Sequence, residues 1–198
     1  MQTMLALFDG LVAVTAIFAA FKARRQKTAD FFSQGGYAAI AIAALIGTVK
    51  FSGVQLLAPH HAIASHIAAI VGVPYAATGF LLVSRDLKLW AVISIAALFV
   101  AAAYVFWASQ SYALIAGIFA QAIWLWGGWR ERRTPGRVLL RVILSVVLTT
   151  VAGLVFAGGG KFHGVDKENI FHALLALALV QQAYAYSYTG LAQTELKS

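Results

Sequence analysis

The sequence predicts an all-α, polytopic membrane protein with seven transmembrane helices. Two observations predict this fold class. First, 61% of the 198 residues are hydrophobic, 11% are charged, and the mean hydropathy is +0.81, whereas soluble domains are about half apolar and a quarter charged. Second, the apolar residues form seven runs, each long enough as a helix to cross a hydrocarbon layer of about 30 Å at about 1.5 Å per residue.

The expected helices follow one another along the whole chain. The first run has no basic residues before it and holds Asp9, so we interpret it as a retained helix and not as a cleaved signal peptide. Little chain remains between the runs, and we expect one transmembrane helical domain over residues 1–198. The seven helices are expected at roughly 3–21, 35–57, 61–83, 89–108, 111–129, 138–157 and 169–190.

Basic residues gather in alternate connections, and the third outer connection, 158–168, is mixed in charge. The connections 58–60 and 109–110 contain no Lys or Arg. The positive-inside rule therefore places the N-terminus outside and the C-terminus in the cytoplasm. Because the net charge of +8 belongs to loops, we expect membrane lipid and no nucleic acid as partner, in an integral protein of a bacterial inner (plasma) membrane. The basic residues that follow the first, third and fifth runs are Lys22, Arg24, Arg25, Lys27, Arg85, Lys88, Arg130, Arg132, Arg133 and Arg137.

Polar residues gather in the outer half of the expected bundle, where a site is expected because ionisable groups in a membrane are expensive. By contrast, the inner halves look almost uniformly apolar, and Arg141 can snorkel to the cytoplasmic surface. Without cysteine, a metal needs His and carboxylate ligands, and Glu168 and His172 have the four-residue spacing that lets one zinc ion bind both. The candidate metal ligands are His61, His66, Glu168 and His172.

Asp9 and Lys50 are the candidate buried ion pair. If the second helix ends near residue 57, both side chains lie about 10 Å below the outer ends of their helices. Equal depth on consecutive helices predicts a structural ion pair between them. A proton or ion pathway is the alternative interpretation.

Three short segments resemble a known family. Residues 168–175 contain Glu168 and His172 four apart, and residues 47–52 contain Thr48 and Ser52 four apart. His60 and His61 lie near the start of the third expected helix, before the segment 72–75. These segments resemble the CREST superfamily of alkaline ceramidases and progestin and adiponectin receptors, which have Ser-x-x-x-His, Asp and His-x-x-x-His in the corresponding helices. Here Glu168 replaces the first histidine of the last motif, and the segment 47–52 contains no histidine.

The resemblance implies a seven-helix fold with zinc that activates water for attack on the amide bond of a ceramide. Applied to this chain, it predicts a lipid amide or ester hydrolase. Its zinc would be held by Glu168, His172 and either His61 or His66, and Ser52 would stabilise the developing oxyanion.

Three function classes remain open. A lipid-binding protein or accessory subunit of a larger membrane complex ranks first, because two motif histidines are missing and the loops are short. In a variant of this hypothesis, His66 or His172 ligates haem or another pigment. The zinc-dependent hydrolase ranks second. A transporter ranks third, because transporters place polar groups near the midplane on broken helices.

Overall fold

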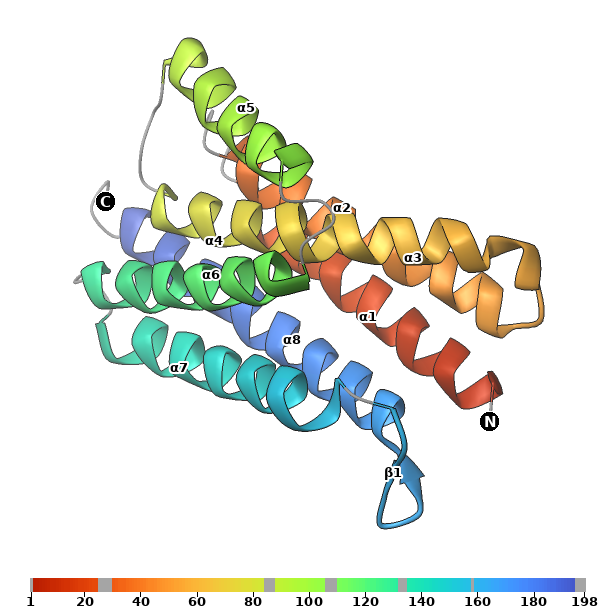
Figure 1. The fold of residues 1–198 in the computed structure, drawn as a ribbon. Helices are drawn as coiled ribbons and strands as arrows, with labels where there is room; N and C mark the ends of the chain where they lie inside the picture. The colour runs from red at the N-terminus through yellow and green to blue at the C-terminus, as the bar shows by residue number, and fades with distance from the viewer. Residues whose placement is uncertain are drawn as a thin grey trace.

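The computed structural model is a bundle of helices with one short β-hairpin (Figure 1). The residues that it describes are 2–24, 30–83, 88–105, 110–131, 135–157 and 159–194. The first half of the bundle contains α1 (Gln2–Ala23), α2 (Asp30–Phe51), the 3₁₀ turn η1 (Gln55–Leu57), α3 (Ala58–Ile67), the π-helical turn η2 (Ala68–Gly72) and α4 (Val73–Leu81). The second half contains α5 (Leu89–Val105), α6 (Gln110–Arg130), α7 (Pro135–Val151), the π-helical turn η3 (Ala152–Phe156), β1 (Lys161–Phe162), β2 (Val165–Asp166) and α8 (Lys167–Thr194).

The described residues form seven helices, because η2 joins α3 to α4 without a break and η3 extends α7. Within the described residues, five helices are long and apolar enough to cross a membrane, which indicates an integral membrane protein. The other two, α5 and α6, lie where spans were expected at 89–108 and 111–129, but they are not among these five. Helix α5 has 17 residues, about 25 Å at 1.5 Å per residue. Helix α6 has 21 residues, and its described part does not form a further span of this kind. The five are Thr3–Ala23, Asp30–Phe51, Gln55–Leu81, Gly136–Phe156 and Lys167–Thr189.

The bundle has two distinct ends. The start of α1, the turn η1 and the β-hairpin lie at one end, which we call the hairpin end (Figure 1). The other end, which we call the arginine end, holds Arg24 after α1, Arg130 at the end of α6 and Arg137 at the start of α7. Helix α8 packs against α1 and α7, and α2 packs against α1 and α4. Helix α5 leans away from the bundle (Figure 1).

Helix α2 begins and ends earlier than expected. It runs from Asp30 to Phe51, whereas the apolar pattern predicted 35–57. The chain turns at Gly53, whose φ of +118° lies in a region that side chains rarely adopt. Proline in the first turn of α3 then starts the next helix at Ala58. As a result, Lys50 lies one residue from the end of α2, and Ser52 lies beyond it.

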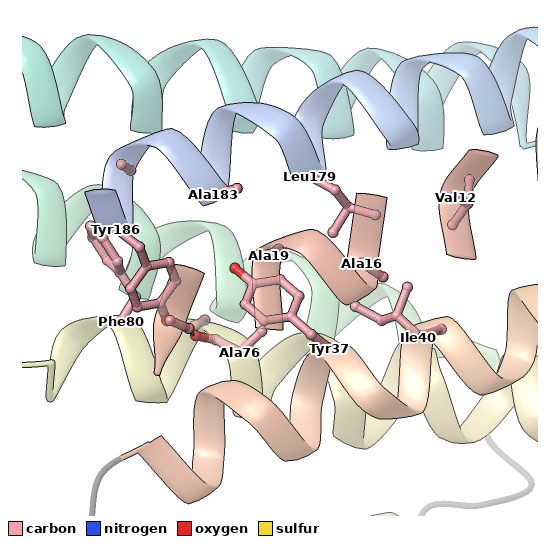
Figure 2. Close-up of a cluster of buried hydrophobic side chains, with 14 of the residues drawn as sticks. Val12, Ala16, Ala19, Tyr37, Ile40, Ala76, Phe80, Leu179, Ala183 and Tyr186 are labelled. Carbon is pink, nitrogen blue, oxygen red and sulfur yellow. Dashed lines mark hydrogen bonds between the residues drawn. The ribbon is translucent and has the colours of Figure 1, made fainter. Parts of the chain in front are cut away.

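Small residues let the central helices approach each other closely. Ala13, Ala16 and Ala19 of α1 are at most 1% exposed, and they recur at a spacing that places them on one face. The core also contains large aromatic side chains at the arginine end. Trp124 and Phe80 stack with ring centroids 4.3 Å apart, and Tyr186 meets Phe80 edge to face at 5.1 Å. Figure 2 shows Phe80 and Tyr186 side by side between α4 and α8.

Candidate ligand site at the hairpin end

A carboxylate–imidazole pair joins the first and last helices. Nε2 of His172 donates a hydrogen bond to Oδ1 of Asp9 over 3.2 Å, and the side chains are only 13% and 2% exposed. Asp9 lies seven residues into α1 and His172 five residues into α8, so both lie about 8–10 Å below the hairpin end. Because the two residues lie at similar depths on neighbouring helices, their side chains can meet between α1 and α8.

The expected ion-pair partner of Asp9 was Lys50, whereas the side chain that the structure places in contact with the Asp9 carboxylate is the imidazole of His172. The expectation assumed that Lys50 lay about two turns inside α2. Because α2 ends at Phe51, Lys50 lies at the helix end, and its ammonium lies 4.1 Å from the centroid of the Phe51 ring. Lys50 therefore snorkels toward the hairpin end, while the Asp9 carboxylate lies deeper.

Helix α2 contributes a gap to the site. A Cβ at Gly47 would overlap Oδ2 of Asp9 and would lie 2.7 Å from Cε1 of His61. A glycine is therefore required where Asp9 and His61 approach the α2 backbone. The sequence segment around Gly47, which resembled a metal motif without its histidine, supplies space and no ligand.

His61 is held in a defined orientation by α2. Its Nδ1 donates to the carbonyl oxygen of Ala43 over 3.2 Å, and its ring meets Phe51 edge to face with centroids 5.7 Å apart. Ser65, one turn further along α3, has its hydroxyl 3.5 Å from the same nitrogen. Because a carbonyl only accepts, Nδ1 carries the proton and Nε2 of the neutral ring is left as an acceptor.

Asp9, His61 and His172 lie on the wall of one cavity. Its volume is about 530 Å³, and it lies among α1, α2, the α3–η2–α4 helix, α6, the α7–η3 helix and α8. Both π-helical turns contribute to the wall, and such turns often occur at functional sites. Most of the wall is apolar. The polar residues on it are Asp9, His61, Ser65, Gln121, Thr149, Thr150 and His172.

The cavity opens on an apolar flank of the bundle. Leu114 and Ile118 of α6 and Leu154 of η3 line it, yet they are 56%, 62% and 72% exposed. Side chains so exposed belong to the rim and not to the enclosed wall. A molecule that enters here would come from the hydrocarbon layer around the helices.

Four buried polar atoms near this cavity have no hydrogen-bond partner, and they are the only such side-chain atoms in the described residues. They are Oδ2 of Asp9, Nδ1 of His172, Oε1 of Gln121 and Oδ1 of Asn169. Three belong to cavity residues, and Asn169 lies one turn before His172. Because buried polar groups are normally paired, a cluster of unpaired ones calls for a ligand or for ordered water. We call Asp9, His61, Gln121, Asn169 and His172 the Asp9 cluster.

The predicted metal site is assembled only in part. His61 and His172 both line the cavity, whereas His66 and Glu168 lie outside its lining, and Glu168 is exposed. Over the part of the chain that the structure describes, no group of three or more His, Asp or Glu residues is arranged to hold a metal ion. Ser52 also lies outside the lining, where its exposed hydroxyl donates to the Thr48 carbonyl over 2.8 Å.

A second polar cluster extends from the middle of the bundle toward the arginine end and corrects the expectation that this half is almost uniformly apolar. Tyr37 donates to Oε1 of Gln182 over 3.0 Å, and Nε2 of Gln182 donates to Ser145 over 2.9 Å. The hydroxyls of Ser33 and Tyr186 share a hydrogen bond of 2.8 Å. Figure 2 shows Tyr37 on α2 with its hydroxyl toward α8. We call Ser33, Tyr37, Ser145, Gln182 and Tyr186 the Gln182 network.

Arg141 also lies near this network, since it donates to Oε1 of Gln181 over 2.8 Å and lies over the Tyr184 ring.

The sequence analysis did not identify Gln121, which lines the cavity. The available signal was an isolated amide inside the apolar run of α6, which ordinarily faces protein or a cavity and not lipid.

No family model matches the chain, and neither a curated protein nor a solved structure matches it. The geometry of the cavity itself is therefore the basis for interpreting function.

Proposed function

We propose that this protein binds an amphiphilic molecule of the membrane, of lipid size, in the cavity at the hairpin end. The observation that carries the proposal is the combination of an apolar wall with one polar patch. Ile40, Val73 and Leu175 are typical of the wall, and Asp9 and His172 form the patch with an unpaired carboxylate oxygen and an unpaired ring nitrogen. An amphiphile would place its chain on the wall and its headgroup at the patch.

Size and access support this proposal. A cavity of about 530 Å³ falls within the range of about 300–1,000 Å³ typical of small-molecule sites, which are mostly apolar with a few placed polar groups. The rim at Leu114, Ile118 and Leu154 is apolar. A lipid can therefore reach the cavity sideways, without leaving the hydrocarbon layer.

The proposal includes an orientation in the membrane. We place the hairpin end outside and the arginine end in the cytoplasm of a bacterial inner membrane, with all seven helices crossing. Arg24, Arg130 and Arg137 at one end support this orientation. The cavity then draws its ligand from the outer leaflet.

Lipid binding is favoured over zinc-dependent hydrolysis by the positions of the candidate ligands. The hydrolase needs Glu168 and either His61 or His66 beside His172, but Glu168 and His66 lie outside the cavity lining. Kinship with the CREST superfamily stays a proposal that rests on two positions, His61 and His172, which do share the cavity. A catalytically silent lipid-binding relative of these hydrolases fits both observations.

Filling the cavity tests the proposal. Gly117 of α6 lines the cavity, and a Cβ there would meet nothing within 4 Å, so Gly117→Phe introduces a ring at a position on the cavity wall that has room for its Cβ. Gly136 of α7 is an exposed matched control outside the lining, where a Cβ also meets nothing within 4 Å. Native mass spectrometry of protein released from its own membrane reads the bound lipid.

We expect one lipid-sized adduct on the wild type and on Gly136→Phe, and its loss from Gly117→Phe. An adduct that survives in Gly117→Phe, or a wild type that carries no specific adduct, would overturn lipid binding in this cavity.

A further inference from the structure

We infer that the headgroup bound by this cavity donates hydrogen bonds and carries no negative charge, and that a protonated amine is bound most strongly. The inference rests on the proposed function, because it names the chemistry of the molecule that the cavity takes. It follows from the unpaired atoms and from the charges on the cavity wall.

All of the unpaired atoms around the site accept hydrogen bonds. Oδ2 of Asp9, Oε1 of Gln121 and Oδ1 of Asn169 are oxygens of carboxylate and amide groups. The Nε2–H group of His172 donates a hydrogen bond to Asp9, so Nδ1 of the neutral ring is also an acceptor. A complementary headgroup must therefore supply N–H or O–H donors, which ammonium and hydroxyl groups do and phosphate diesters do not.

The charges on the wall point the same way. The lining contains one carboxylate, Asp9, and no Lys or Arg. Lys50, the neighbouring cation at this end of α2, lies over the Phe51 ring and outside the lining. A phosphate or carboxylate headgroup would meet the Asp9 carboxylate with no Lys or Arg of the lining to pair with, whereas a protonated amine would neutralise it.

His61 adds a further acceptor near the Asp9 carboxylate. Its Nδ1 is occupied by the Ala43 carbonyl, so Nε2 is available as an acceptor. Cε1 of His61 and Oδ2 of Asp9 both lie within 3 Å of the position that a Gly47 Cβ would take. A headgroup with several protons, such as an ammonium, can therefore bind acceptors on α1, α3 and α8 together.

The test titrates purified protein in nonionic micelles with three amphiphiles of identical chain: dodecylamine, dodecanol and dodecyl phosphate. Calorimetry measures each affinity on the wild type and on Gly117→Phe, whose filled cavity reports partition into the micelle alone. We expect cavity-dependent binding of the amine and the alcohol. Since a hydrogen bond to a charged group is worth about 1.5–3 kcal/mol, the amine should bind about tenfold or more tightly than the phosphate.

Asp9→Asn adds a second readout, because it keeps the shape and removes the charge. We expect this substitution to lower the affinity for dodecylamine about tenfold and the affinity for dodecanol much less. Asp30→Asn is the matched control, since Asp30 is also a buried carboxylate, 7% exposed against 2% for Asp9, but lies at the arginine end. The wild-type series alone decides the inference if Asp9→Asn fails to fold.

The outcomes separate the two proposals. Equal or tighter binding of dodecyl phosphate to the wild type, still lost in Gly117→Phe, would overturn the headgroup inference and leave lipid binding intact. Binding of all three probes that is identical in wild type and Gly117→Phe would overturn the proposed function itself.

Discussion

The two polar clusters of the bundle differ in how completely their hydrogen bonds are satisfied. In the Gln182 network, both ends of the Gln182 amide are paired, and Ser33 shares a hydrogen bond with Tyr186. In the Asp9 cluster, four buried atoms have no partner in the described part of the chain, and a cavity lies beside them. A paired network holds helices together, whereas an unpaired cluster beside a cavity retains capacity to bind.

Conformation differs between the two regions as well. The Gln182 network is filled by large rings, with Tyr186, Phe80 and Trp124 in mutual contact. The Asp9 cluster is flanked by the π-helical turns η2 and η3, which are the irregular points of two long helices. Regular packing at one end and irregular helices around a cavity at the other fit a scaffold that carries a site.

The largest effect on stability is expected from a substitution that breaks the Gln182 network. Gln182→Leu removes the acceptor of the Tyr37 hydroxyl and the donor to the Ser145 hydroxyl, and we expect a loss of about 2–4 kcal/mol in the free energy of unfolding, at about 1–3 kcal/mol for each buried group that loses this partner. Denaturant unfolding in micelles measures it. The control is Ser187→Ala on the same helix, because the Ser187 hydroxyl donates to the Ala183 carbonyl of its own helix. If both variants unfold alike, the network is not structural.

The sequence predicts the helices and the end at which the ionisable residues gather, because long apolar runs and their flanking charges are local features. It singles out Asp9 and His172 individually for the same reason. It does not predict that they meet. That contact depends on the rotation of α1 against α8, on the shape of the turn at Gly53, and on the absence of a side chain at Gly47. Together these three features determine which side chain contacts Asp9.

The Gln182 network was harder to predict than the Asp9 cluster. Ser33 and Tyr37 lie one turn apart on α2, and Gln182 and Tyr186 lie one turn apart on α8. Each pair alone is ordinary in a membrane helix. Only the packing of α2, α4, α7 and α8 shows that these uncharged side chains meet each other and not lipid.

A middle-sized effect is expected where α2 approaches the Asp9 cluster. Gly47→Ala would place a methyl group against Asp9 Oδ2, so the carboxylate must move from His172, and we expect about 1–3 kcal/mol of destabilisation as for other overpacked sites. It should also abolish the lipid adduct. Gly117→Ala is the control, because a Cβ there meets nothing within 4 Å. A Gly47→Ala protein as stable as wild type would mean that Asp9 does not contact α2.

The smallest effect is expected when the glutamine-to-leucine substitution is made in the Asp9 cluster and not in the Gln182 network. Gln121→Leu removes an unpaired buried oxygen, so it orphans no partner there, and we expect the free energy of unfolding of ligand-free protein to change by less than about 0.5 kcal/mol or to rise. The same variant should also bind dodecylamine more weakly, since Gln121 is one of the proposed acceptors for the amine. Destabilisation by Gln121→Leu as large as that by Gln182→Leu would show that the Asp9 cluster is structural, because only a paired amide is costly to remove.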